Sequence, residues 1–99
     1  MPSLSLEHSV TVSDNTIFRE LNGEAVLLQI DAGMYYGLDD VGTRLWQLML
    51  EHRRLQLVLD AALAEFEVDP ADLQRDLLAL TQQLVDRGLL VATAGQREA

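Results

Sequence analysis

Between positions 17 and 38 the chain alternates weakly between apolar and polar residues and is interrupted twice by turn residues, which predicts three short β-strands. The first strand is expected over residues 17–21 and ends at Asn22-Gly23, a dipeptide that supplies the two positive φ angles of a type I′ hairpin turn. The second strand is expected over residues 24–30. Asp31-Ala32-Gly33 suits a three-residue hairpin loop before a third strand at residues 34–38. The pattern therefore predicts a three-stranded antiparallel meander.

Turn lengths determine which residues face each other in such a sheet. A two-residue loop pairs Leu21 with Glu24, and a three-residue loop pairs Ile30 with Met34. The more apolar face is then expected to be the core side, with Ile17, Val26, Leu28, Ile30, Met34, Tyr36 and Leu38. The opposite face is expected to show Phe18, Ala25, Leu27, Gln29 and Tyr35.

The third strand has an unprotected edge. It contains no lysine, no proline and no charged residue, which are the usual devices that prevent a strand edge from pairing with another chain. Its free N–H and C=O groups could pair with any extended peptide. Residues 1–16 are a polar arm in which Val10-Thr11-Val12 could form a further strand, and coverage of the open edge by this arm is the main alternative.

From residue 39 the apolar period changes from two to 3.6, which predicts helices. Asp39 or Asp40 is expected to cap the first helix, and Trp46 is expected to lie in its buried face. The second helix has a regular apolar stripe of Leu55, Val58, Leu59, Ala62, Leu63 and Phe66. The boundary between these two helices, at residues 51–54, carries no turn residue.

The third helix is the most clearly delimited element. It is expected from Pro70, with Asp69 as its N-cap, to Arg87, with Gly88 just beyond its end. Its main stripe of Leu73, Leu77, Leu80 and Leu84 is extended by Leu78 and Val85. This apolar sector is wider than one packing contact requires.

Composition and charge exclude several classes of function. The 99 residues with 48% hydrophobic content suit one small domain, and 16 acidic against seven basic residues give a net charge of −9. Such a chain repels phosphate backbones and anionic membranes, so nucleic acid and membrane partners are not expected. The first residues lack a basic segment and a long apolar run, so no signal peptide is expected and the protein is predicted to be cytoplasmic.

No set of residues indicates catalysis. The chain has no cysteine, and all seven basic residues are arginine, which excludes thiolate and lysine chemistry. His8 and His52 have no partner at a metal-ligand spacing, so no metal site and no cofactor are expected. Asp39-Asp40 and the pair Asp72 and Asp76 fall in the first turns of helices, where negative charge stabilises the helix dipole. The sequence does not predict an enzyme.

Several motifs in a fixed order resemble the PqqD-like peptide chaperones, also called RiPP recognition elements, which act in the synthesis of ribosomally made and modified peptides. The motifs are Glu-Ala-Val-Leu-Leu at 24–28, Gly-x-Tyr-Tyr-x-Leu at 33–38, Asp-Asp-Val-Gly-x-x-x-Trp at 39–46, Phe-x-Val-Asp at 66–69, Asp76-Leu77-Leu78 and Gly88-Leu89-Leu90. The resemblance covers residues 17–91 and leaves 1–16 as an arm and 92–99 as a flexible tail. It implies an α+β, winged helix-turn-helix-like fold with a three-stranded meander followed by three helices.

The resemblance also implies a function without catalysis. In this family the leader of a precursor peptide adds as a strand to the third strand of the sheet and contacts the third helix. Carried onto this chain, the implied binding residues are Met34, Tyr35, Tyr36, Gly37, Leu38, Asp76, Leu77, Leu80, Gln83 and Leu84. The implied partner enzyme is a radical SAM enzyme, a leader peptidase or a cyclase, in a pathway to pyrroloquinoline quinone, a lasso peptide or a related product.

Two other functions remain as alternatives. The basic doublet Arg53-Arg54 between two helices is compatible with a small winged-helix DNA-binding regulator, although two arginines make few phosphate contacts. The open strand edge could also pair with itself in a homodimer, which would make the chain an oligomerisation module.

Overall fold

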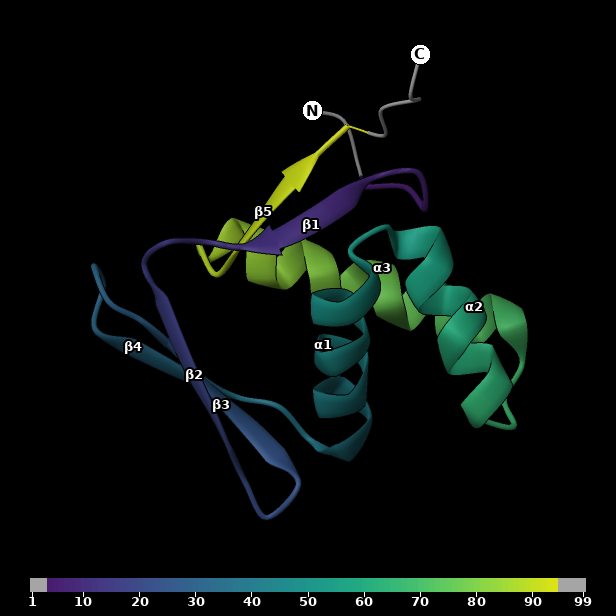
Figure 1. The fold of residues 1–99 in the computed structure, drawn as a ribbon, viewed down its shortest axis with the longest axis horizontal. Helices are drawn as coiled ribbons and strands as arrows, with labels where there is room; N and C mark the ends of the chain where they lie inside the picture. The colour runs from purple at the N-terminus through teal and green to yellow at the C-terminus, as the bar shows by residue number, and fades with distance from the viewer. Residues whose placement is uncertain (1–3, 95–99) are drawn as a thin grey trace.

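The computed structural model describes residues 4–94, and the three strands of the predicted meander form in it (Figure 1). Strands β2 (Thr16–Leu21), β3 (Glu24–Gln29) and β4 (Met34–Gly37) form one antiparallel sheet in the order β2-β3-β4. Asn22 and Gly23 both have positive φ, and the β2–β3 register pairs Leu21 with Glu24, as predicted. Three helices follow the meander, so the predicted fold class is confirmed.

The second turn is longer than predicted. Its loop contains four residues, 30–33, so that Met34 pairs with Gln29 and Tyr36 pairs with Leu27, and the predicted pairing of Ile30 with Met34 is wrong. The N–H of Gly33 donates to the carbonyl of Gln29 at 2.9 Å, and the Gln29 side-chain oxygen accepts from the N–H of Ala32 at 2.8 Å. These bonds draw Ile30 out of the strand and into the loop.

The sheet also presents to the core the face opposite to the predicted one. Ala25 and Leu27 are 0% exposed and Gln29 is buried, whereas Ile17, at 52% exposed, lies on the outer face. The small Ala25 allows the first helix to lie directly on this face, and the ring of Phe18 packs edge-on against Trp46 with 5.2 Å between centroids. Because β4 is shifted by one residue, Tyr36 lies on the inner face with Leu27. The predicted choice of buried face is wrong because both faces carry apolar side chains, so their composition does not distinguish them.

The helices are α1 (Asp40–His52), α2 (Leu55–Glu65) and α3 (Pro70–Asp86). The Asp39 side chain accepts from the N–H of Gly42 at 2.8 Å, and that of Asp69 accepts from the N–H of Ala71 at 2.8 Å, so both helices begin at a carboxylate cap. Trp46 is fully buried in α1, as predicted. In residues 4–94 no helix has both the length and the apolar character that crossing a membrane requires.

An exposed ion pair connects α1 to α2. Arg44 Nη2 lies 2.6 Å from Glu65 Oε2, and its Nε lies 2.8 Å from Glu65 Oε1. The hydrogen bonds from Arg44 lower the pKa of Glu65, and those to Glu65 raise the pKa of Arg44. Because both side chains are exposed to solvent, this pair adds little to the free energy of unfolding.

A buried threonine joins α1 to the sheet. The Thr43 hydroxyl accepts a hydrogen bond from the N–H of Ala25 at 2.7 Å and donates one to the carbonyl of Leu38 at 3.2 Å. The N–H of Leu38 in turn donates to the carbonyl of Ala25 at 2.8 Å. One side chain on α1 therefore fixes the start of β3 and the chain just beyond β4.

The N-terminal segment forms a strand that does not cover β4. Strand β1 (Ser9–Val12) pairs antiparallel with β5 (Leu90–Thr93) in a separate two-stranded sheet (Figure 1). Val10 is buried in the core, so this part of the expected polar arm is integral to the fold. Ala92 and Thr93 of the expected tail also belong to β5, and the rest of that tail, residues 95–99, lies outside the described residues.

We expect Thr43→Val to lower the free energy of unfolding by about 1–3 kcal/mol, because the buried N–H of Ala25 loses its acceptor. Chemical denaturation followed by circular dichroism measures this change. Thr81→Val is the matched control: Thr81 is also buried, but its hydroxyl donates to a carbonyl of its own helix, that of Leu77. An equal loss in both variants would contradict the special role of Thr43.

Candidate functional site

The outer edge of β4 has no neighbouring strand in the described part of the chain, because the sheet order ends at β4. In an antiparallel ladder, alternate residues bond to the partner strand and the others direct their N–H and C=O groups away from it. The N–H of Leu38 donates to the carbonyl of Ala25 in β3. Tyr36 and Met34, two and four residues earlier, follow the same alternation and direct their N–H and C=O groups toward β3. The N–H and C=O groups of Tyr35 and Gly37 therefore point to the open edge.

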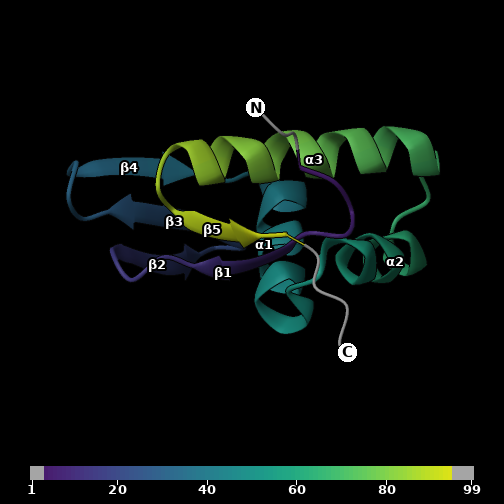
Figure 2. The ribbon, with the colours of Figure 1, turned by 90° about the horizontal axis from the view of Figure 1, so that it is seen from above.

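One row of residues on α3 runs along the helix to Arg87, which contacts this strand. Asp76, Leu80, Gln83 and Arg87 are spaced by four, three and four residues, which places them along one side of the helix and its C-cap. The guanidinium carbon of Arg87 lies 4.9 Å from the ring centroid of Tyr36, in a cation–π contact. Figure 2 shows the C-terminal end of α3 next to β4, in agreement with this contact.

The residues implied by the family resemblance divide into three groups. Met34, Tyr35 and Gly37 are exposed on or beside the open edge, whereas Tyr36 and Leu38 are half-buried on the inner face. On α3, Asp76 and Gln83 are exposed and Leu80 is half-buried. Leu77 and Leu84 are 0% and 2% exposed, so they support the helix from the core and offer no surface for direct contact.

Sequence reasoning missed Arg87 as a site residue. It was assigned only to the helix end, although its spacing of four from Gln83 and seven from Leu80 is the signal that could have found it. No salt bridge joins Arg87 to another residue among 4–94. Its guanidinium is thus available to a carboxylate placed beside Tyr36.

The outer face of the sheet continues this exposed region. Tyr35 is 69% exposed and shares a shallow hollow of about 410 Å³ with Ile17, Val26 and Leu28. Large apolar side chains gathered on one face are common where a protein contacts a partner. Tyr35 belongs both to this face and to the open edge of β4.

The arrangement is suited to binding an extended chain. The open edge offers main-chain donors and acceptors, and the inner side adds an aromatic ring, a half-buried leucine and a guanidinium. Within residues 4–94 there is no group of three His, Asp or Glu side chains that could hold a metal ion.

Comparisons with known proteins agree with this geometry. Residues 24–90 match the family described as coenzyme PQQ synthesis protein D (PqqD). The solved structure of TbiB1 in complex with the TbiA(beta) leader peptide has a TM-score of 0.77 and 35% sequence identity, over 89% of this chain and 99% of that one. Lasso peptide synthetase B1 complexed with the leader peptide has the same fold, with a TM-score of 0.75 and 24% identity, over 84% of this chain and 98% of that one. No curated protein matches the chain.

We expect the amide protons of Tyr35 and Gly37 to exchange with solvent at least about 100-fold faster than that of Tyr36, because only Tyr36 bonds to β3. Hydrogen–deuterium exchange followed by NMR of the free protein measures these rates. Strong protection of Tyr35 and Gly37 would mean that the edge is already paired in solution.

Proposed function

The chain belongs to the PqqD family, and from this membership we propose that it binds the leader segment of a ribosomally made precursor peptide and presents it to a modifying enzyme. The chain spans 99% of the TbiB1 chain with 35% identity, and that protein is solved with a leader peptide bound. The binding requires no catalytic group in this protein.

The open edge of β4 is the observation that supports this proposal most directly. A leader segment in extended conformation would add as a strand to β4 and pair with the N–H and C=O groups of Tyr35 and Gly37. These main-chain bonds do not depend on the peptide sequence. They would supply affinity for any segment that can become extended.

Side chains on the inner side would supply selectivity. Residues directly opposite in an antiparallel pair have Cβ atoms about 4.5–5.5 Å apart, so a peptide side chain opposite Tyr36 would lie near the guanidinium of Arg87. The next inward side chain along the peptide would approach the row formed by Gln83, Leu80 and Asp76. The edge strand and α3 together would then read alternate residues of the leader.

The partner enzyme belongs to the classes that modify such precursors: a leader peptidase, a cyclase or a radical SAM enzyme. The likeness to two leader-bound proteins, one of them described as lasso peptide synthetase B1, favours a peptidase and cyclase pathway. The DNA-binding alternative has weaker support, because a net charge of −9 opposes contact with phosphates.

We expect Gly37→Pro to weaken leader binding about tenfold or more, because it removes one main-chain donor at the open edge and places a ring against the incoming strand. The N–H of Gly37 points away from β3 and a Cβ there meets no atom within 4 Å, so the change removes no bond between β4 and β3. Fluorescence polarisation with a labelled TbiA(beta) leader peptide, the ligand of the 35% identical TbiB1, measures the affinity.

Gly37→Ala is the matched control, since it adds a Cβ in open space but keeps the N–H, and its affinity should stay within about twofold of wild type. Circular dichroism of both variants checks the fold. Unchanged binding by a folded Gly37→Pro variant would refute strand addition at β4.

The same edge could pair with β4 of a second copy. If it does, saturating leader peptide will convert a dimer to a monomer of about 11 kDa plus peptide, because both partners need the same N–H and C=O groups. Multi-angle light scattering with and without the leader measures this. A dimer that persists with the leader bound would place the self-association elsewhere.

A further inference from the structure

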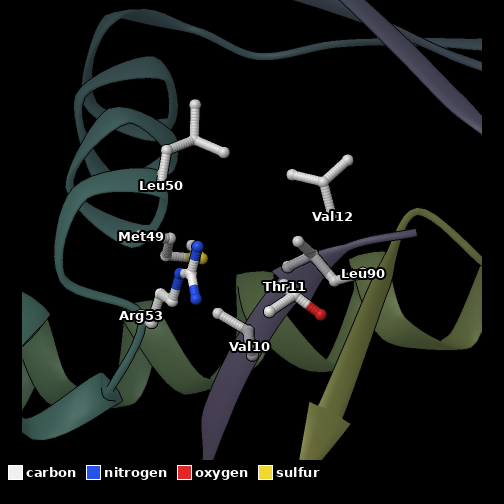
Figure 3. A pocket seen from close by; sticks show the side chains of 7 residues that line it. All are labelled: Val10, Thr11, Val12, Met49, Leu50, Arg53 and Leu90. Carbon is white, nitrogen blue, oxygen red and sulfur yellow. The ribbon is translucent and has the colours of Figure 1, made fainter. Parts of the chain in front are cut away.

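A second cavity lies on a different part of the molecule from β4 and α3. It has a volume of about 270 Å³, is open to solvent on one side, and lies between the β1–β5 ribbon and the C-terminal end of α1 (Figure 3). Its lining is apolar apart from Thr11 and one arginine, Arg53; the other residues are Val10, Val12, Met49, Leu50 and Leu90. None of these residues belongs to β4 or α3, so both regions can be occupied together.

Arg53 is held in a strained backbone conformation. Its φ and ψ are +67° and −51°, and the N–H of Arg54 donates to the carbonyl of His52 at 2.7 Å, which makes a γ-turn centred on Arg53. A glycine would adopt this conformation without a steric penalty, yet the chain has an arginine here. Strained residues are concentrated at binding and catalytic sites, where the side chain serves a purpose.

The side chain extends from the γ-turn beside Met49 toward the space between Leu50 and Val12 (Figure 3). No salt bridge joins it to another residue among 4–94. The guanidinium therefore presents its five donors in the lining of an otherwise largely apolar cavity.

We propose that this cavity is a docking site for a partner protein, and that it takes an apolar side chain adjacent to a carboxylate, as in a Leu-Glu pair. The apolar side chain would fill the space between β1 and α1, and the carboxylate would bond to the guanidinium of Arg53. This proposal rests on the cavity and the γ-turn and does not depend on leader binding.

The size and chemistry of the cavity favour this occupant over others. A volume of about 270 Å³ is below the roughly 300–1,000 Å³ of pockets that enclose small-molecule ligands, and it fits one or two side chains. One guanidinium matches one carboxylate in a planar, bidentate pair. Because the Arg53 side chain lies along this cavity, the Arg53-Arg54 doublet does not present two parallel charges to a phosphate backbone.

The test uses N-acetyl-Leu-Glu-methylamide as probe and N-acetyl-Leu-Gln-methylamide as its uncharged counterpart, titrated into the ¹⁵N-labelled full chain and followed by NMR. We expect saturable shifts at the amides of Val10, Thr11 and Val12, with a Kd of about 1 mM for the Glu probe, which corresponds to about 4 kcal/mol of binding free energy. The Gln probe should bind at least about fivefold more weakly, because it lacks the ionic bond to Arg53.

Two variants distinguish a specific bond to Arg53 from a general effect of positive charge on probe binding. Arg53→Met should abolish the difference between the Glu and Gln probes, whereas Arg54→Met, which changes the neighbouring arginine outside the cavity lining, should preserve it. Equal binding of the two probes to wild type, an unchanged difference in Arg53→Met, or no saturable shift up to about 20 mM probe would overturn the proposal.

Thermal unfolding gives an independent test of the strain. Arg53→Gly should raise the melting temperature by about 4 °C while losing the preference for the Glu probe, and Arg54→Gly, at an ordinary extended residue with φ of −74°, should lower the melting temperature. A lower melting temperature in Arg53→Gly would show that the arginine stabilises the turn, and would overturn the inference that its side chain is retained for binding.

Discussion

The double hydrogen bond of the Thr43 hydroxyl determines how the sheet lies on the helices. Because Thr43 bonds to the N–H of Ala25 and to the carbonyl of Leu38, α1 must approach the face of β3 that carries Ala25 and Leu27. That approach buries the smaller of the two apolar faces and leaves Ile17, Val26 and Leu28 outside. It also fixes the end of β4, so that the edge of this strand lies beside α3 and not against another part of the chain.

Local turn chemistry explains how much of the fold could be predicted from the sequence. Asn22-Gly23 determined the β2–β3 register, and Asp69-Pro70 determined the start of α3, because in both cases the residues that set the geometry are adjacent in the chain. The four-residue loop depends on a side-chain bond from Gln29, and the choice of buried face depends on a helix that follows later. Neither is visible in the alternation of apolar and polar residues.

The candidate site, like the fold, could be predicted only in part from the sequence. The unprotected character of β4 is a property of its own residues and could be seen in the sequence. The sequence does not show whether the N-terminal segment covers β4, because that depends on which groups the backbone of residues 6–12 bonds to. In the structure the N–H of Val10 donates to the carbonyl of Arg53, the N–H of Gln56 donates to the carbonyl of Leu6, and β1 pairs along its whole length with β5. These bonds retain the segment at the opposite sheet and leave β4 open.

The β1–β5 ribbon has a consequence for the order of folding. It joins Ser9 to Thr93, residues 84 positions apart, whereas the meander needs only short loops. Contacts between distant residues carry a larger loop-closure cost and form later than local ones. The meander is therefore expected to assemble first, with the face that carries Ala25 and Leu27 exposed, in addition to the edge of β4, until α1 packs on it. During this interval the newly made protein is most prone to pair with other unfolded chains through β4, and a ligand that occupies this edge early would protect it from aggregation.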